Sequence, residues 1–326
     1  MSSARSAHAV SVDLIAVLAA VTAGAPRVMT LKDGRALPSG PFGLEHRSLQ
    51  SGLRAWVEEK TQHPLGYVEQ LYTFADKDRA GSESPQRTIS ISYLGLTRAL
   101  DDAEAGWISW YDYFPWEDHR TGAPALIETL IAPALEQWVK ATRSPAMRDI
   151  RRQRAEVTFG LGEHLWNEEL TLQRYELLYE AGLVCESHRH DAAEEDGLRD
   201  AKTPSGSRKN GNAPLIAGLD MIADHRRILA TGIARLRAKI KYRPVVFELM
   251  PPTFTLLQLQ RCVEALAGRT VHKQNFRRLM EAQELVEETG ETTSETIGRP
   301  AKLFRFRHSV VTERALSGSK LPLARA

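Results

Sequence analysis

The sequence predicts a mixed α+β protein in two parts, and two patterns along the chain carry that prediction. In the first hundred residues, short apolar and β-branched runs alternate with one amphipathic stretch. In the last quarter, residues 254–307, two helical patterns are followed by two strand-like runs. The chain has 326 residues, which is long enough for two domains and a sizeable core.

The first part is expected to contain several strands and one early helix. Strands are expected at residues 12–19, 28–31, 67–74 and 88–96, with a turn at 37–42. A helix is expected at 46–62, because apolar side chains recur there on one face, at Leu49, Leu53, Trp56 and Val57.

A long segment, residues 117–214, separates these elements from a helix expected at 220–241. Helical patterns recur within it at 126–140 and 164–181. Residues 187–214 are almost all polar, which predicts a flexible loop because too little apolar surface can be buried there. Four residues in or near this loop are of metal-binding types: Cys185, His188, His190 and Asp191. No second pair completes a tetrahedral site, so no metal is expected.

Residues 107–116 hold six aromatic side chains. Two interpretations of this run are open. The rings could stack on a nucleobase, or they could form part of the core or of a dimer interface. We favour the core or interface, because large aromatic side chains bury the most area.

The last quarter begins with a capped helix. Thr255 and Gln258 have the spacing of a capping box, and Gly268 is placed to end the helix in a left-handed cap. A second, basic helix follows, with Phe276, Leu279 and Met280 expected on its apolar side. Strands are expected at 285–289 and 301–307. The order helix, turn, basic helix, hairpin is typical of a winged helix-turn-helix.

This arrangement predicts DNA binding, because a helix fits the major groove and presents its side chains to base edges. Gln274 and Asn275 can form paired hydrogen bonds with adenine, and Arg277 or Arg278 can form them with guanine. Lys273 is better placed to contact a phosphate. The candidate DNA-binding residues are Thr255, Lys273, Gln274, Asn275, Arg277, Arg278, Arg299 and Lys302. Residues 287–295 are acidic, so the wing is expected to contact DNA only at its base. The alternative is a basic helix face that is merely solvated.

Composition limits the other classes of function. The formal net charge is only +2, so nucleic-acid binding would depend on a local patch. Two widely separated cysteines exclude a disulfide framework and fit a reducing cytoplasm. The apolar run at 10–21 contains Asp13 and is too short to span a bilayer. No membrane association is therefore expected.

Residues 40–62 resemble a degraded Nudix box, whose pattern is G-x5-E-x7-R-E-U-x-E-E-x-G-U with U bulky and apolar. Five positions match: Gly40, Arg54, Trp56, Glu58 and Glu59. Four do not, because His46, Ala55, Thr61 and Gln62 replace the first glutamate, the glutamate of the R-E pair, the late glycine and the last apolar residue. In Nudix enzymes these glutamates hold metal against a pyrophosphate. Two of the four carboxylates are lost, so no catalytic residue is expected. Arg54 and Glu58 could instead form a surface ion pair.

Further stretches match the Nudix-related transcriptional regulators of NAD metabolism (NrtR type). They are residues 67–74 with Asp76 and Arg79, residues 242–251, residues 254–256, residues 273–278 and residues 298–301. With its long insertion and degenerate box, the chain most resembles the alphaproteobacterial regulators of NAD biosynthesis (NadQ type). The resemblance implies a cytoplasmic, homodimeric repressor that reads a palindromic operator in double-stranded DNA. It also implies an adenine nucleotide effector (NAD, ADP-ribose or ATP) and no required cofactor.

The expected organisation is a Nudix-like αβα sandwich at 1–241, a linker at 242–252, a winged helix at 253–310 and a tail at 311–326. Arginines that could pair with phosphate, together with the two box glutamates, give the candidate effector-binding residues: Arg47, Arg54, Glu58, Glu59, Arg79 and Arg87. Two other functions stay open. One is an active Nudix pyrophosphohydrolase acting on ADP-ribose or a related dinucleotide through Glu58, Glu59 and magnesium. The other is an adaptor whose basic helix contacts RNA or a protein.

Overall fold

A computed structural model of the protein describes residues 10–62, 65–75, 87–98, 106–189, 215–216, 218–293, 300–307 and 309. The strands are β1 (Val10–Thr22), β2 (Ala25–Met29), β3 (Ser39–Pro41), β4 (Tyr67–Phe74), β5 (Arg87–Leu96), β6 (Trp107–Ser109), β7 (Val286–Thr293) and β8 (Ala301–Phe306). The α-helices are α1 (Leu49–Thr61), α2 (Trp110–Tyr113), α3 (Ala132–Lys140), α4 (Pro145–Phe159), α5 (Thr171–Glu180), α7 (His225–Ile240), α8 (Leu256–Ala267) and α9 (Lys273–Gln283). Shorter turns are the π-helical η1 (Ile127–Ile131) and the 3-10 turns η2 (Glu168–Leu170), η3 (Cys185–His188) and η4 (Val245–Leu249).

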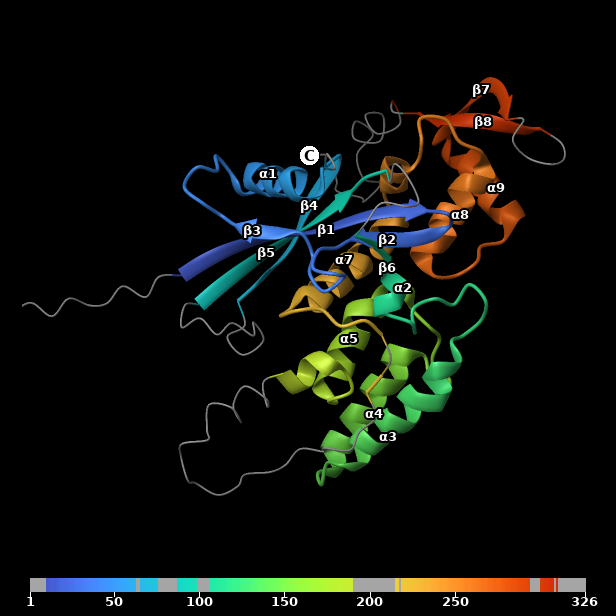
Figure 1. Ribbon diagram of the computed structural model, residues 1–326. Coiled ribbons are helices and arrows are strands. Elements are labelled where there is room, and N and C mark those ends of the chain that lie inside the picture. The colour runs from blue at the N-terminus through green and yellow to red at the C-terminus, as the bar shows by residue number, and fades with distance from the viewer. Residues whose placement is uncertain are drawn as a thin grey trace, which may run out of the picture.

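A mixed sheet forms the centre of the N-terminal part. Its strand order is β4-β5-β1-β2-β6, and β3 pairs with β1 off this path. Strand β1 runs parallel to β5 and antiparallel to β2 and β3. Helix α1 covers one face of this sheet and α7 covers the other, as Figure 1 shows.

Residues 14–20 of strand β1 are buried on both faces, which explains why every residue from Leu14 to Val21 is apolar. Leu14 and Leu18 pack with α1 in one cluster, whereas Ile15 and Val17 pack with α7 in a second cluster. Successive side chains of a strand point to opposite faces, so a strand between two helical layers needs apolar residues at every position. The expected αβα sandwich is confirmed.

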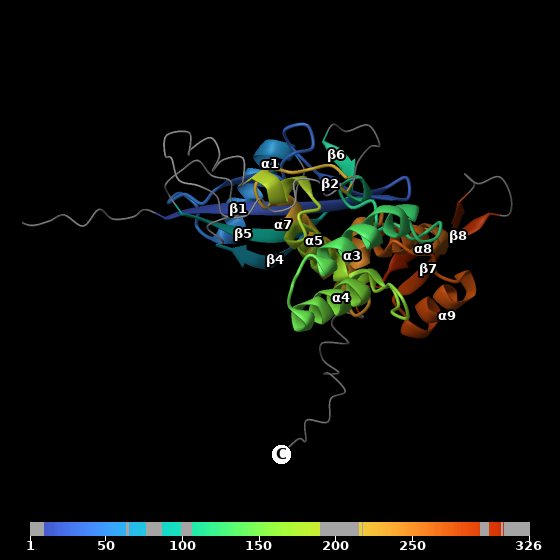
Figure 2. The same ribbon diagram turned by 90° about the horizontal axis from the view of Figure 1, so that it is seen from below.

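The insertion is helical, and its helix α5 packs against α7, which covers the sheet's second face. Figure 2 shows α3, α4 and α5 grouped together, and α8 contacts β1 and β2 directly beside this group. The aromatic run at 107–116 belongs to the core, because Trp110, Tyr113, Phe114 and Trp116 are at most 1% exposed. The favoured interpretation of these rings is therefore confirmed.

Helix α4 was not expected from the sequence. Ser144 caps its start, Pro145 occupies its first turn, and Gly160 ends it with a φ of 62°. These are ordinary boundary signals. The apolar pattern between them is weak, since Ala155 and Phe159 are the apolar side chains that α4 buries. From residue 190 onward, the expected loop at 187–214 lies outside the described residues, as do His190 and Asp191.

The C-terminal part has the expected order of elements. The Thr255 Oγ1 accepts a hydrogen bond from the backbone N–H of Gln258 at 3.1 Å, and the Gln258 side chain accepts one from the Thr255 N–H at 2.7 Å. Gly268 ends α8 in the left-handed region, at a φ of 70°. Strands β7 and β8 then pair as an antiparallel hairpin. The capping box, the glycine cap and the hairpin are confirmed.

One local expectation was wrong. The turn expected at 37–42 contains strand β3, whose Pro41 pairs with Asp13 of β1. Leu279 lies on the same side of α9 as Phe276 and Met280, since all three line one cavity, but 49% of Leu279 is exposed.

Candidate nucleic-acid interface

The turn between α8 and α9 is fixed by side chains of α8. A carboxylate oxygen of Glu264 accepts hydrogen bonds from the Val271 N–H at 2.9 Å and from the Gln260 amide at 3.0 Å. The same amide donates to the Val271 carbonyl at 3.1 Å. These bonds determine where α9 begins, and Phe276 and Met280 then anchor its inner face in the core.

The outer face of α9 carries the predicted reading residues. Lys273, Gln274, Asn275, Arg277 and Arg278 are all exposed. The Arg278 guanidinium donates to the side-chain amide oxygen (Oδ1) of Asn275 over a long contact of 3.4 Å. Within the described part of the chain, no carboxylate pairs with the three cations of this face. Their charges are therefore available to an anionic partner.

A groove of about 710 Å³ runs beside this face. Its lining comes from the start of α8, the start of α9 and the base of the hairpin, and includes Leu257, Lys273, Arg277, Pro300 and Lys302. Thr255 also lines the groove but is 9% exposed, and its hydroxyl oxygen already serves as the helix cap. Thr255 therefore positions α8 in this structure.

Two basic side chains of the wing form ion pairs with carboxylates of the wing itself. Lys302 pairs with Glu288 at 2.9 Å, and Arg305 pairs with Glu287 at 2.5 Å. Lys302 would have to leave Glu288 to reach a phosphate. Arg299 lies outside the described residues. The contact of the wing base with DNA stays a prediction.

Four of the six candidate effector residues lie on or just before α1. Arg47, Glu58 and Glu59 are exposed, whereas Arg54 is half-buried. Arg54 does not pair with Glu58; it donates to the backbone carbonyls of Leu65 and Gly66. Arg54 therefore ties α1 to the segment that leads into β4.

The remaining box positions can also be placed. The Trp56 ring lies over Gly40, where any Cβ would collide with it. His46, which replaces the first box glutamate, accepts a hydrogen bond from the Gly43 N–H at 3.0 Å through its Nδ1. Ala55 is exposed. Arg79 lies outside the described residues, and the structure does not describe the Arg87 side chain. The structure therefore places Arg54, Glu58 and Glu59 on one helix. Effector binding by the six candidate residues stays a prediction.

No metal centre is visible in the part of the chain that the structure describes: no three His, Cys, Asp or Glu side chains come together there. Nor does any helix within the described ranges combine the length and the apolar character that crossing a membrane requires.

A buried charged cluster, which no pattern in the sequence indicates, lies behind the interface. Glu117 binds Arg174 and Arg237, and all three side chains are at most 1% exposed. Burial would raise the pKa of the Glu117 carboxyl, but the two guanidinium groups together hold that pKa below its usual value. Glu117 is therefore ionised and fully paired in the interior.

Three donors of the N-terminal part bind the last carbonyls of α8. The Tyr111 hydroxyl donates to Ala265 at 2.6 Å, and the Arg237 Nε donates to Leu266 at 2.9 Å. The backbone N–H of His119 donates to Gly268 at 2.7 Å. The last four carbonyls of a helix lack partners within that helix. These bonds therefore fix the end of α8 directly to the N-terminal part; we call them the α8 clamp.

Comparison with known proteins identifies the C-terminal part. Residues 246–306 match the family described as the NrtR DNA-binding winged helix domain. The chain is 43% identical over 89 residues to a protein of Acinetobacter baylyi named ADPR responsive transcriptional repressor NtrR. That alignment covers 27% of this chain and 35% of the relative, so the chain matches about a third of the relative's length. The C-terminal part is therefore similar to the winged helix of NrtR-type proteins, as the sequence predicted.

Two solved structures align over most of the chain at low similarity. Shewanella oneidensis NrtR complexed with a 27mer DNA is 17% identical, with 92% of this chain and 95% of that chain covered and a TM-score of 0.48. A MutT/nudix family protein from Enterococcus faecalis is also 17% identical, with 92% and 88% covered and a TM-score of 0.47. The strands and helices of this chain themselves define its sandwich fold.

Proposed function

We propose that this protein is a nucleotide-responsive transcriptional repressor of NAD biosynthesis genes. Its winged helix would bind double-stranded DNA, and its Nudix-like part would sense an adenine nucleotide. The observation that carries the proposal is the outer face of α9, where polar and basic side chains are exposed without a described carboxylate partner. The match of residues 246–306 to a DNA-binding domain supports it.

The groove beside α9 suggests how DNA would bind. With α9 in the major groove, Gln274 and Asn275 would form paired hydrogen bonds with adenine, and Arg277 or Arg278 with guanine. Lys273, at the first turn of the helix, would contact a phosphate and set the register. A palindromic operator would need two copies of this helix, so the proposal includes a homodimer. It also places the protein in the cytoplasm.

ADP-ribose is the first effector to consider, ahead of NAD and ATP. The curated relative is named as responsive to ADPR, although it matches only part of this chain. Arg47 and the exposed Glu58 and Glu59 remain the proposed contacts on α1. The proposal assigns the N-terminal part a sensing role without catalysis, because two carboxylates of the box are replaced. We also propose that the protein belongs to the long NadQ type.

The α8 clamp supplies a route from sensor to operator. A helix that is bound at its end by Tyr111 and Arg237 follows any movement of those side chains. A nucleotide that favours one arrangement of the N-terminal part would then favour one orientation of α8 and α9. The change in operator affinity could not exceed the difference in nucleotide affinity between the two arrangements.

A binding assay on the promoter beside the protein's own gene tests the proposal. Fluorescence anisotropy with that duplex should show tight, salt-dependent binding, and a scrambled duplex should bind more weakly. ADP-ribose, NAD and ATP are added in turn, and at least one should change the affinity. Single-stranded RNA competing as well as duplex DNA would favour the adaptor instead. Equal binding of both duplexes at every salt concentration would contradict a repressor.

A further inference from the structure

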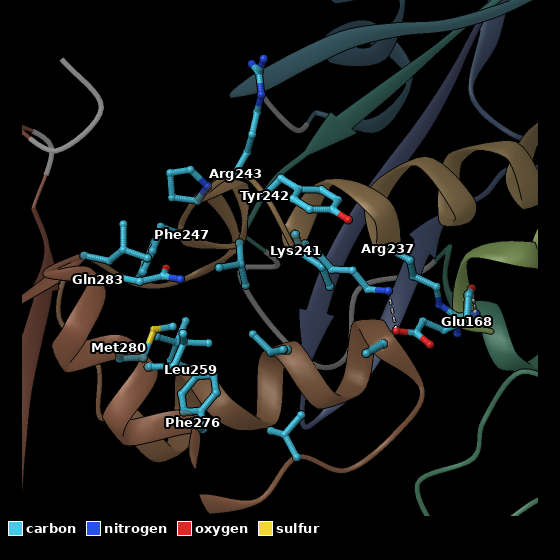
Figure 3. Close-up of a pocket in the computed structure, with 18 of the residues that line it drawn as sticks. Glu168, Arg237, Lys241, Tyr242, Arg243, Phe247, Leu259, Phe276, Met280 and Gln283 are labelled. Atoms are coloured by element: carbon cyan, nitrogen blue, oxygen red, sulfur yellow. Dashed lines mark hydrogen bonds and ion pairs between the residues drawn. The ribbon is translucent and has the colours of Figure 1, made fainter. Parts of the chain in front are cut away.

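A cavity of about 330 Å³ lies between the two parts, against the inner side of α9 (Figure 3). Its walls come from the end of α7, the turn η4 and helices α8 and α9. Most of the lining is apolar and includes Val246, Phe247, Leu259, Val263, Phe276 and Met280. Figure 3 shows Phe276, Leu259 and Met280 facing Phe247 across this space. Ligand sites with volumes of about 300–1,000 Å³ and mostly apolar walls are typical of proteins.

One end of the cavity is polar and carries more cations than it can pair. Lys241 binds Glu168 at 2.9 Å, and Arg269 binds the same carboxylate at 3.3 Å. Lys241 also binds Glu169 at 2.6 Å. Arg237 also lines this end, whereas the Arg243 side chain runs away from it (Figure 3). Glu117, the carboxylate partner of Arg237, is shared with Arg174. Four cations therefore meet three carboxylates at this end, which leaves one positive charge in excess; the cations are Lys241, Arg269, Arg237 and Arg174.

Apolar side chains at the mouth are left open to solvent. Tyr242 is 80% exposed and Leu279 is 49% exposed, and both line the cavity. A molecule seated here would cover both of them. An apolar body would fit the walls, and an anionic group would fit the end near Lys241 and Arg269.

We propose that this cavity is a ligand site for a small amphiphilic anion, with an aromatic or aliphatic body and one acidic group. The site is separate from the proposed nucleotide contacts, since it is not lined by Arg47, Arg54, Glu58 or Glu59. Its occupant would touch the inner face of α9, whose outer face carries the reading residues. Occupancy would therefore fix α9 relative to α7 and change operator affinity.

Two fluorescent probes of matched shape test the site on the full chain without DNA. Anilinonaphthalene sulfonate has an aromatic body and an anion, whereas N-phenylnaphthylamine has the same body without the anion. The sulfonate should bind saturably, one per chain, and the neutral probe about tenfold more weakly, because a charge-assisted contact is lost. Equal affinities, or no saturable binding of either probe, would overturn the proposal.

Three variants locate the bound probe. Lys241→Ala removes a cation at the polar end, and Leu279→Glu places a negative charge at the mouth on a half-exposed position. Each should weaken sulfonate binding by about tenfold. Ile150→Glu is the matched control, since Ile150 lies on α4 and is 50% exposed. Thermal melting checks that each variant is folded. If Leu279→Glu is not folded, the test uses Lys241→Ala alone, and Lys241→Arg should restore sulfonate binding because it restores the cation.

Unchanged sulfonate binding in folded Lys241→Ala and Leu279→Glu would show that the probe binds elsewhere and would overturn the proposed site. Operator affinity is then measured with and without the sulfonate. Since the titration needs no DNA, a failure of DNA binding and a failure of the cavity site give different results.

Discussion

Arg237 and Leu266 join the two parts of the molecule through one buried hydrogen bond. The Arg237 Nε, near the end of α7, donates to the Leu266 carbonyl in the last turn of α8 at 2.9 Å. The Arg237 guanidinium is held in place by Glu117, and both side chains are at most 1% exposed. The winged helix therefore does not depend on its linker alone for its orientation.

The Tyr111 hydroxyl, another member of the α8 clamp, offers a mild test of this coupling. Tyr111→Phe removes the bond to Ala265, and Tyr113→Phe removes a bond of the same length, 2.6 Å, to Gly34 within the N-terminal part. Both changes should lower the free energy of unfolding by about 0.5–1.5 kcal/mol. Only Tyr111→Phe should reduce the effect of ADP-ribose on operator affinity, measured by anisotropy. The same effector response in both variants would contradict transmission through the clamp.

The parts of this fold that could be predicted depend on neighbours in sequence. The cap at Thr255 needs only Gln258, three residues away, and the end of α8 needs only Gly268. Strand β1 is recognisable because its residues from Leu14 to Val21 are all apolar. The class of the fold and the winged helix follow from such local signals.

The α8 clamp could not be predicted, because its partners are far apart along the chain. Tyr111 and Ala265 are 154 residues apart, and Glu117, which holds the clamp residue Arg237 in place, is 120 residues away from it. A single glutamate such as Glu117 looks like a surface charge in sequence. Arg54 illustrates the same difficulty within the candidate site: its spacing to Glu58 suggested an ion pair, and only the fold places it beside the carbonyls of Leu65 and Gly66.

His225 should make stability depend on pH between about 4 and 6.5. Its burial lowers the pKa to about 4 from the ordinary value of 6.5, and its Nδ1 accepts a hydrogen bond from the Leu37 N–H at 2.8 Å. The unfolded chain therefore binds the proton more readily, so the free energy of unfolding falls as pH drops through this window. The loss approaches about 3 kcal/mol at the lower limit and is absent above pH 7.

Urea denaturation at several pH values measures this dependence. His225→Gln keeps an acceptor for the Leu37 N–H but has no proton to gain. Its unfolding free energy should therefore change less than that of the wild-type protein between pH 7 and pH 5. Parallel pH profiles for the two proteins would show that His225 is not the source.

The degenerate box should leave the N-terminal part without hydrolase activity. Ala55 and His46 stand where two carboxylates are needed, and His46 is already bound to the Gly43 N–H. Incubation of the protein with Mg²⁺ and ADP-ribose or NAD should give no turnover above the rate without protein, measured by chromatography of the products. Multiple turnovers that are lost in Glu58→Gln would establish the pyrophosphohydrolase instead.

Alanine substitutions on α9 distinguish base reading from phosphate contact. If α9 lies in the major groove, Arg277→Ala or Arg278→Ala should cost about 1–3 kcal/mol on the operator and relax specificity at one base pair. Lys273→Ala should weaken operator and scrambled duplexes alike and reduce the salt slope by about one unit. Arg35→Ala is the matched control, because Arg35 is an exposed arginine of the N-terminal part that pairs with Asp220 at 3.3 Å. Anisotropy at several salt concentrations measures all four variants. Wild-type affinity in the three α9 variants, with folding unchanged, would show that this face is merely solvated and would remove α9 as the DNA reader.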